Sequence, residues 1–260
     1  MINSIMITTT LICMFLVIYH HLGYPLILRW FNKRNPRLVT VASPRQYTNS
    51  QADDDLPKIA IVIPAYNEQE WIAEKIRNLA ILDYPLKRLQ IVIACDGCTD
   101  QTYAIAAKTA AETECFHLPI QIINFTKNRG KVAVLNQLIE QLDCDLVALS
   151  DTSALLSIDA LLLAAERFKD SDVGVLTGHY GLLSPGSEGE QTYWNYQSEI
   201  KASEAALGAT LGAHGAFYVF RHHLFEPLPA DTINDDFILP MNIVAQGYRA
   251  EYENGINALE

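Results

Sequence analysis

The sequence predicts an α/β protein in which a mostly parallel sheet is flanked by helices, with a transmembrane helix at the N-terminus. Two observations predict this fold class. Apolar, β-branched runs alternate with segments of helical periodicity at intervals of roughly 30 residues, which is the length of one βαβ unit. Ahead of them, residues 1–28 contain no Asp, Glu, Lys or Arg. This run exceeds the roughly 20 residues that a helix needs to cross a bilayer.

Residues 1–31 are therefore expected to form a transmembrane anchor whose last part lies at the membrane interface. Tyr19, Tyr24 and Trp30 suit the aromatic belt of such an interface. A cleaved signal peptide is the alternative. We favour the anchor, because no basic residue precedes the apolar run and no small-residue cleavage site follows it closely.

The charges after the anchor predict the side of the membrane. Basic residues mark the cytoplasmic side, and four follow the apolar run closely: Arg29, Lys33, Arg34 and Arg37. We expect a protein of the cell (inner) membrane with its main domain in the cytoplasm. Five Cys without framework spacing suit that reducing compartment. Residues 32–57 are rich in Pro, Ser, Asn, Gln and Asp, so we expect a linker there and one domain over residues 58–260.

The overall charge excludes a general nucleic-acid binder. The chain has 19 Lys and Arg against 30 Asp and Glu, a net charge of −11. Affinity for nucleic acids comes mostly from cationic side chains that displace counterions from phosphates. A phosphate-bearing ligand of this acidic protein is instead expected to arrive with a metal ion.

Four apolar runs after the linker are the expected strands, at residues 59–63, 89–94, 120–125 and 145–150. Short, continuously apolar runs are typical of parallel strands that are covered on both faces. Ligands of such sheets bind beyond the carboxyl ends of the strands. Polar residues follow each run, so we expect a pocket there, although a single polar end could also be a helix N-cap.

The second and third strand ends each allow two interpretations. Cys95-x-x-Cys98 could be a redox or zinc pair, but it lacks the partners that zinc spacing requires. A sharp turn at Gly97 that points Asp96 into the pocket is favoured instead. Gly130-Lys131 lacks the spaced glycines of a phosphate loop. It is either a helix N-terminus that attracts a diphosphate or a solvated lysine.

The fourth strand end and a later acidic pair are also ambiguous. Asp151-x-Ser153 has the oxygen ligands that Mg²⁺ or Mn²⁺ prefers, or it caps a helix that begins near residue 157. Asp235 and Asp236 precede a segment with Phe237, Met241 and Val244 at helical spacing. Such a pair either complements the helix dipole or contains a carboxylate whose raised pKa suits proton abstraction.

A histidine and an aromatic group each allow two interpretations. His214 lies between glycines and either lines a cleft or is a buried histidine with its hydrogen bonds satisfied. Tyr193, Trp194 and Tyr196 form an aromatic group that could stack on sugars, although such groups more often belong to a core or contact a membrane.

Together these segments resemble family 2 of the glycosyltransferases, the cytoplasmic, membrane-anchored group that includes cellulose, hyaluronan and poly-N-acetylglucosamine synthases. Six segments follow the family's order: IAIVIPAYNEQEWIAEKIRNL, IVIACDGCTDQT, NRGKVAVLN, LVALSDTS, GAHGAFYVFRHHLF and NDDF. The resemblance covers about residues 58–253. It implies the GT-A fold, which is a nucleotide-binding α/β sandwich.

The resemblance also implies roles for individual residues. Ala65, Tyr66, Glu68 and Asp96 would bind the base and ribose of the donor, and Lys131 would lie near its diphosphate.

The remaining implied roles concern the metal and the reaction. Asp151, assisted by Ser153, would bind Mg²⁺ or Mn²⁺. Asp236 would be the catalytic base with Asp235 beside it, while His214 and Gly215 would lie on the acceptor side.

The implied activity is inverting transfer from a nucleotide-diphosphate sugar, expected to be a UDP-sugar, to a hydroxyl of a glycan or lipid-linked acceptor at the cytoplasmic membrane face. Two departures qualify it: Ser153 stands where the family has Asp, and the chain ends at Glu260, without the Gln-x-x-Arg-Trp helix and membrane spans of processive members. We therefore expect a C-terminally truncated form.

Two rival functions remain. A non-catalytic nucleotide-sugar-binding or truncated subunit of a polysaccharide synthase complex would bind the donor without transfer. A nucleotidyltransferase is disfavoured, because its glycine- and Arg-rich loop is missing after Ile63.

Overall fold

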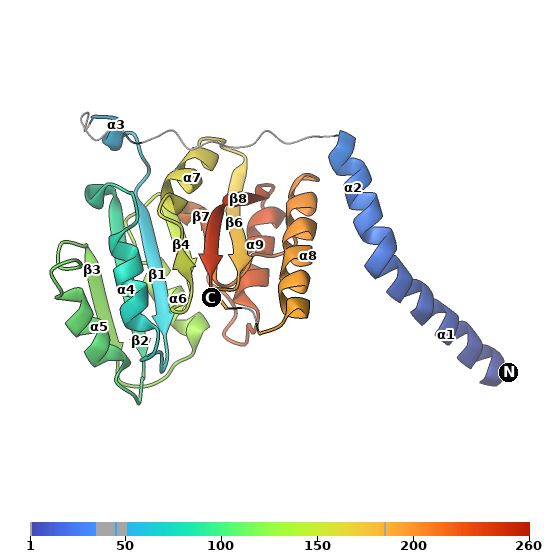
Figure 1. Ribbon diagram of the computed structural model, residues 1–260, viewed down its shortest axis with the longest axis horizontal. Helices are drawn as coiled ribbons and strands as arrows, with labels where there is room; N and C mark the ends of the chain where they lie inside the picture. Colours follow the sequence, from blue (N-terminus) through green and yellow to red (C-terminus); the bar gives the residue numbers. More distant parts are fainter. Residues whose placement is uncertain (1, 35–44, 46–50, 185) are drawn as a thin grey trace.

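The computed structural model describes residues 2–34, 45, 51–184 and 186–260. Its N-terminal part is one long helical rod that consists of α1 (Ile2–Ile18), a π-helical turn (Tyr19–Gly23) and α2 (Tyr24–Arg34). The π-turn ends at Gly23, two residues before Pro25, which has no backbone N–H to donate to a regular helix. The α1 end of the rod projects away from the other elements (Figure 1).

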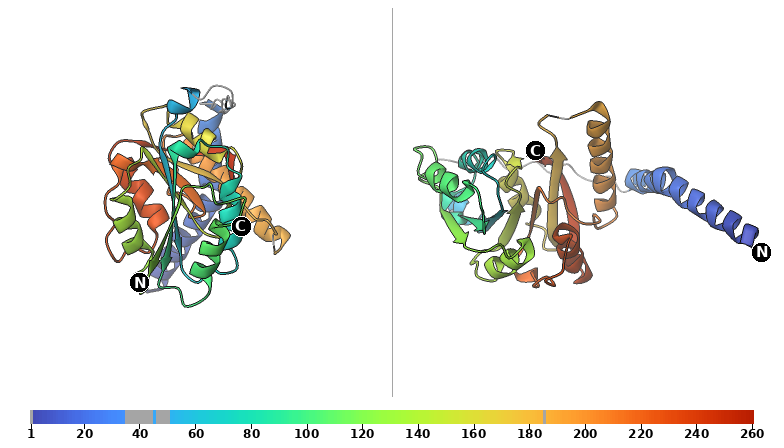
Figure 2. Two further views of the ribbon diagram at one scale, coloured as in Figure 1. Left: turned by 90° about the vertical axis from the view of Figure 1, so that its left-hand side faces the viewer. Right: turned by 90° about the horizontal axis from the view of Figure 1, so that it is seen from below.

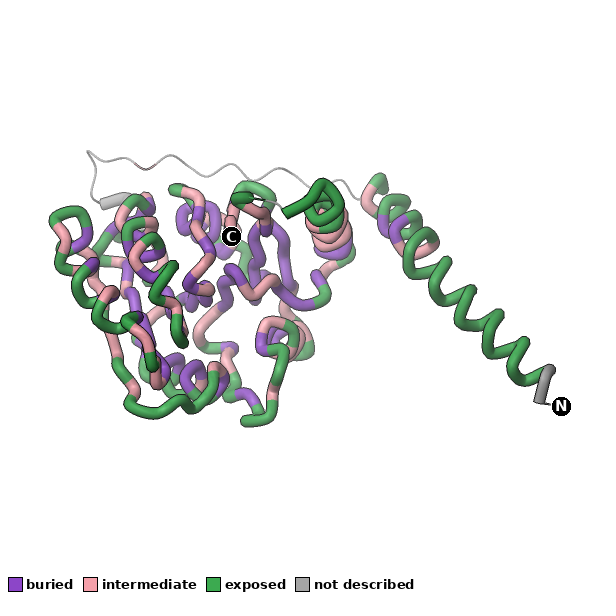
Figure 3. The backbone as a smooth tube through the Cα atoms, turned by 60° about the horizontal axis from the view of Figure 1, so that its bottom comes forward, coloured by how far each residue is buried: buried purple, intermediate pink, exposed green. Residues whose placement is uncertain are grey.

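The rod agrees with the expected anchor. Ser4–Arg34 forms one helix of 31 residues that is long and apolar enough to cross a membrane. Its outer part is exposed throughout (Figure 3). Helical structure continues to Arg34, beyond the expected start of the linker at residue 32, and most of that linker, together with Arg37, lies outside the described residues.

The rest of the chain alternates strands and helices and confirms all four expected strands. The elements are α3 (Gln51–Asp54), β1 (Ile59–Ala65), α4 (Ile72–Ala80), η2 (Leu86–Arg88), β2 (Leu89–Asp96), α5 (Thr102–Ala110), β3 (Ile120–Phe125), α6 (Lys131–Ile139), β4 (Leu146–Ser150), β5 (Leu155–Leu156), α7 (Ala160–Arg167), β6 (Val173–Gly181), α8 (Glu188–Ala205), β7 (Phe217–Arg221), η3 (His222–Leu224), α9 (Asp235–Ala245) and β8 (Arg249–Leu259).

The strands form one sheet in the order β3-β2-β1-β4-β7-β6-β8-β5. β3, β2, β1 and β4 are parallel to one another, whereas β7 pairs antiparallel with both β4 and β6. The strand order reverses between β1 and β4, because the chain first adds β2 and β3 on one side of β1 and then β4 on the other. Ligands of open α/β sheets bind at such a switch point.

Helices cover both faces of the sheet (Figure 2). Along β1, Ile59, Ile61 and Ile63 point into one core, which also contains residues of α4 and α7. Ala60 and Val62 point into the other core, which also contains residues of α6 and α9. All five of these β1 side chains are buried, as a parallel strand between two helical layers requires.

One expectation about the helices is wrong in its starting point. The helix expected near residue 157 begins only at Ala160, because the short strand β5 pairs with β8 first. The helical segment expected after the acidic pair is present as α9, whose buried residues include Leu239 and Ile243, whereas Phe237 is exposed.

Candidate active site

A pocket of about 430 Å³ lies at the switch point of the sheet. Its walls come from the ends of β1, β2 and β4, the segment before α6, and the first residue of α6. The lining residues include seven of the predicted site residues: Ala65, Tyr66, Glu68, Asp96, Lys131, Asp151 and Ser153. Segments that are up to 89 residues apart in the sequence therefore share one cavity.

Asp96 organises the segment that leads into α6. Its carboxylate is only 4% exposed and accepts hydrogen bonds from the backbone N–H groups of Arg129, at 3.0 and 3.1 Å, and Gly130, at 2.9 Å. The next residue, Gly97, has a φ of +66°, and a Cβ there would lie 2.1 Å from the backbone nitrogen of Asn128. The turn expected at Gly97 is present. It packs the end of β2 closely against the segment that follows β3.

The CxxC pair lies within this packing. Burial raises the pKa of the Cys95 thiol to about 12, so its reactive thiolate form is suppressed at neutral pH. Cys98 donates a weak hydrogen bond to the carbonyl oxygen of Ala65. Both thiols are free in the structure.

Lys131 stands at the N-terminus of α6 between two carboxylates. Its Nζ lies 3.3 Å from Asp151 Oδ1 and 3.4 Å from Asp235 Oδ2. Burial would lower the pKa of Lys131, but the two carboxylates outweigh burial and raise it. The lysine is therefore held as a cation at the point where a helix N-terminus already attracts anions.

Asp151 and Asp236 both have raised pKa values. For Asp151 the main cause is burial, opposed by Lys131 and reinforced by Glu260. For Asp236 the causes are burial and then the charge of Asp235, opposed by Lys131. A carboxylate whose pKa is raised in this way binds a proton more readily and so suits general-base catalysis.

Gly215 separates these two carboxylates. A Cβ at this position would lie 3.3 Å from Asp151 Oδ2 and 3.4 Å from Asp236 Oδ2. The structure thus brings the predicted metal ligand, the predicted base and the predicted acceptor-side glycine together, from β4, α9 and the segment before β7.

His214 belongs to an aromatic cluster. Its ring stacks on Tyr180 with centroids 3.8 Å apart, and the edge of Trp194 approaches it at 5.2 Å. Burial, reinforced by the charge of Lys201, lowers the pKa of His214 to about 4. The imidazole is therefore neutral at physiological pH, and its Nδ1 accepts a hydrogen bond from the backbone of Ala216.

Ser153 is engaged by a residue that sequence reasoning missed. Its hydroxyl donates a hydrogen bond of 2.7 Å to Glu260 Oε1, and the other Glu260 oxygen accepts one from Tyr180. Ser153 therefore bonds to the residue that follows β8 rather than capping a helix. No local motif marks Glu260, because it meets Ser153 only through the pairing of β8 with β6 and β5.

Lys75 is the second residue that sequence reasoning missed. It is fully buried in α4, where its Nζ donates hydrogen bonds to Ser150 Oγ at 2.7 Å and to the carbonyl oxygen of Ala154. Burial lowers its pKa to about 7 against the attraction of Asp151 and Glu260. A signal was available: this lysine occupies the apolar face of a helix, beside Ile72 and Ile76.

The pocket suits a divalent cation that is shared with a phosphate ligand. Within the described ranges, no three His, Cys, Asp or Glu side chains form a cage for a metal. Mg²⁺ needs only one or two carboxylates when phosphates supply the other oxygens. Asp151 offers such a carboxylate beside Thr152, whose buried hydroxyl has no hydrogen-bond partner. The oxygen-only chemistry fits Mg²⁺ or Mn²⁺.

Residues 60–228 match the family described as glycosyl transferase family 2. The chain belongs to glycosyltransferase family 2. It is therefore a glycosyltransferase domain, and the resemblance inferred from the six sequence segments is confirmed.

This family 2 domain is similar to poly-β-1,6-N-acetyl-D-glucosamine synthases. It is 29% identical to the synthase of Staphylococcus aureus strain COL over 208 residues. This matched region covers 77% of this chain and 49% of that protein. It is 26% identical to the synthase of Staphylococcus epidermidis over 249 residues, and this matched region covers 92% of this chain and 56% of the relative. The chain thus spans about half the length of these curated relatives.

Solved structures confirm the GT-A fold of this family 2 domain. The mannosyltransferase PcManGT from Pyrobaculum calidifontis, in complex with GDP-Man and Mn²⁺, matches with a TM-score of 0.73 and 24% identity over 93% of this chain and 66% of its own. S. aureus TarS 1-349, in complex with UDP-GlcNAc, matches with a TM-score of 0.58 and 19% identity over 78% of this chain and 58% of its own.

Proposed function

We propose that this chain is the donor-binding and catalytic part of an inverting glycosyltransferase that moves a sugar from a nucleotide-diphosphate donor to a hydroxyl of a glycan or lipid-linked acceptor. Lys131 and Asp151 line one pocket, and Asp236 lies across Gly215 from Asp151; this arrangement carries the proposal. The rod of α1 and α2 suits attachment to the inner membrane, and the basic residues that follow its apolar part favour a cytoplasmic domain.

The donor is a nucleotide sugar, and a UDP-sugar is the form that we propose. Tyr66 and Glu68 at the end of β1 contact the base and ribose, with Ala65 beneath them and Asp96 holding the neighbouring segment in place. Support for N-acetylglucosamine as the sugar comes from similarity to synthases of poly-β-1,6-N-acetyl-D-glucosamine and from a TarS structure that contains UDP-GlcNAc.

Lys131 and the N-terminus of α6 stabilise the negative charge that develops on the leaving diphosphate. Asp151 would hold Mg²⁺ or Mn²⁺, with Ser153 assisting through water. The bound ion supplies further positive charge to the diphosphate. Because Ser153 already donates to Glu260, we expect weaker metal affinity than two carboxylates would provide.

Asp236 removes the proton of the acceptor hydroxyl. The acceptor oxygen attacks the anomeric carbon on the face opposite the diphosphate and forms the new glycosidic bond. The bond between that carbon and the diphosphate oxygen breaks, so the configuration inverts and nucleoside diphosphate leaves. Burial and the adjacent Asp235 raise the pKa of Asp236, which strengthens it as a base.

Asp236→Asn tests this function. The variant removes the base but keeps the shape of the side chain, so we expect release of UDP from UDP-GlcNAc with Mn²⁺ to fall at least about 100-fold. Donor affinity, measured by calorimetry, should stay within about twofold. The exposed Asp231, changed to Asn, is the matched control. Near-normal turnover by Asp236→Asn would contradict the assignment, and donor binding without UDP release by the wild type would favour a non-catalytic subunit.

A further inference from the structure

The membrane-proximal helix α2 contacts the globular domain at α8. Tyr24 donates a hydrogen bond of 2.6 Å to Glu204 Oε1. Nearby, Asn32 donates to Ser203 Oγ at 3.4 Å, and Leu28 of α2 is 1% exposed. These contacts join residues about 170 to 180 positions apart in the chain, so they belong to the tertiary fold.

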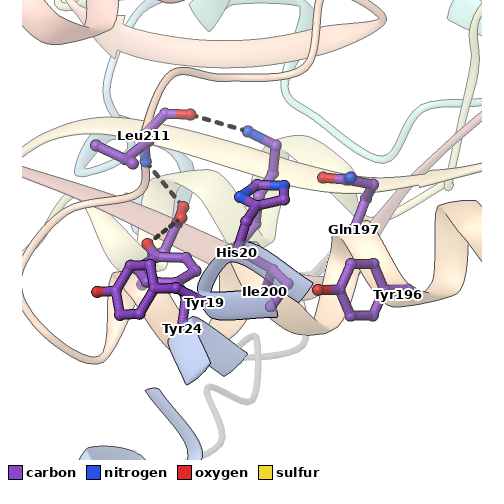
Figure 4. A pocket seen from close by; sticks show the side chains of 9 residues that line it. Tyr19, His20, Tyr24, Tyr196, Gln197, Ile200 and Leu211 are labelled. Carbon is purple, nitrogen blue, oxygen red and sulfur yellow. Dashed lines mark hydrogen bonds between the residues drawn. The ribbon is translucent and has the colours of Figure 1, made fainter. Parts of the chain in front are cut away.

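Glu204 also holds the segment that follows α8. Its second oxygen accepts a hydrogen bond of 3.0 Å from the backbone N–H of Leu211. Figure 4 shows both bonds, from Tyr24 to the carboxylate and from the carboxylate to the backbone of Leu211. The glutamate is only 6% exposed, and a buried carboxylate is costly unless its oxygens are satisfied. Each of its two partners therefore contributes to holding it.

Lys201 supports the same segment from α8. Its Nζ donates to the carbonyl oxygens of Leu211 at 3.2 Å and Gly212 at 3.4 Å. Two side chains of α8 thus hold this backbone: Glu204 binds the N–H of Leu211, and Lys201 binds the carbonyl oxygens of residues 211 and 212. Tyr24, Lys201, Glu204 and Leu211 also line a pocket of about 390 Å³ between the rod and α8.

Residues 211–215 then lead to the proposed base. The backbone N–H of Ala213 donates to the carbonyl oxygen of Asp236 at 2.7 Å. Gly212 has a φ of +72°, and a Cβ there would lie 3.4 Å from that same carbonyl oxygen. Gly215, as described above, separates Asp151 from Asp236. A displacement of Leu211 would therefore be transmitted to both carboxylates.

We propose that Tyr24 and Glu204 are positioning residues that couple the membrane anchor to residues 211–215 and so align Asp236 with the acceptor. The inference rests on the proposed function for the role of Asp236, but the coupling itself is a structural property. Its physical basis is a partly buried, charge-assisted hydrogen bond, which is worth more than one between neutral groups. The anchor thus helps to order the site instead of only tethering it.

Hydrogen exchange of the full-length protein in detergent tests the coupling without any activity. Tyr24→Phe removes one donor and keeps the ring, while Glu204→Gln turns an amide N–H₂ toward the Tyr24 hydroxyl or the Leu211 N–H. We expect the amide of Leu211 and its neighbours to exchange roughly fivefold faster or more in either variant. The matched control is Glu199→Gln on the same helix, whose ion pair with Arg29 is about two-thirds exposed and contributes little.

Turnover provides the second readout. In membrane vesicles with UDP-GlcNAc as the probe, we expect Tyr24→Phe to lower kcat for UDP release roughly fivefold with the donor KM unchanged, and the Tyr24→Phe, Glu204→Gln double variant to lose no more than Glu204→Gln. If the variant were only destabilised, its melting temperature and the fraction of active protein would fall instead.

The two proposals fail differently. Unchanged exchange at residues 211–215 in both variants would overturn the coupling, whatever the wild-type activity. Faster exchange with unchanged kcat would overturn its role in aligning Asp236. Absence of UDP release from the wild type would contradict the proposed function or its donor, while leaving the exchange result valid.

Discussion

Asp151, Lys131 and Asp236 depend on one another for their charge states. Lys131 is kept protonated by Asp151 and Asp235, and it in turn opposes the rise in the pKa of both Asp151 and Asp236. A cationic ligand near Asp151 would release Lys131 toward the diphosphate of a donor. In the proposed function, a metal ion would compete with Lys131 for Asp151, and the donor diphosphate would compete with Asp151 for Lys131.

We expect Asp151→Asn to weaken Mn²⁺-dependent donor binding at least about tenfold, because an amide is a poorer ligand for a hard cation. Titration calorimetry of UDP-GlcNAc with and without Mn²⁺ measures the effect. Asp159→Asn is the control, since Asp159 is exposed. If the variant kept the full affinity gain from Mn²⁺, Asp151 would not be a metal ligand.

Lys75 predicts a pH dependence of stability. Its pKa is about 7 in the folded chain against an ordinary value of 10.5, so the unfolded chain binds more protons between these values. The unfolding free energy of the wild type should therefore rise between pH 6.5 and pH 9.5. Relative to the change in Lys75→Met, this rise should be at most about 3 kcal/mol. Thermal unfolding at the two pH values measures this difference.

The control for Lys75 is Lys108→Met, which changes an exposed lysine and should leave the pH dependence as in the wild type. Equal pH dependence of wild type and Lys75→Met would show that Lys75 does not titrate in this range. Below its folded pKa, the buried ammonium carries its full desolvation cost, which the bonds to Ser150 and Ala154 offset only in part.

At the scale of elements, the site depends on how closely strand ends approach one another. β2 ends in a turn that contacts the segment before α6, and Asp96 caps that segment through backbone N–H groups. Asn67 after β1 accepts a hydrogen bond of 2.8 Å from the N–H of Thr99 after β2. The three strand ends therefore form one rigid wall of the pocket.

Gly97→Ala should break this wall. The left-handed φ and the 2.1 Å approach to Asn128 leave no room for a Cβ, and we expect a loss of at least about 1–3 kcal/mol in unfolding free energy. Thermal or urea unfolding measures it. Gly189→Ala in α8 is the matched control, where an added Cβ meets only an ordinary contact of 3.8 Å. A melting temperature unchanged by Gly97→Ala would contradict the close approach.

At the scale of the whole molecule, an acidic α/β domain is joined to an apolar rod. The rod touches the domain mainly through α2 and α8, so we expect the domain to fold without it. The domain's own cores on the two faces of the sheet do not include residues of α1.

Deleting residues 1–34 should therefore release the protein from membranes and leave the domain folded. We expect the full chain in the pellet after carbonate extraction and the shortened chain in the supernatant, with its near-ultraviolet circular dichroism retained. A full-length Thr9→Val chain should stay in the pellet. Recovery of wild-type protein in the carbonate supernatant would contradict the anchor.

Most elements were predictable because their signals are local. Apolar runs located β1 to β4, and the uncharged N-terminal run located the rod. The short strand β5, the burial of Lys75 and the face of α9 were not predictable in this way, since each depends on a partner strand or helix distant in the chain. Asp235, for example, is buried only because α9 packs against the sheet beside Lys131.

By itself, the sequence determined the α/β class, the apolar helix, the polar strand ends and, through six ordered segments, membership of glycosyltransferase family 2. Only the tertiary structure decided that Ser153 bonds to Glu260, that the buried Lys75 bonds to Ser150, and that Tyr24 bonds to Glu204. The physical reason is the range of the interactions. Periodicity and turn chemistry act over a few residues, whereas these hydrogen bonds form only after distant strands and helices have packed.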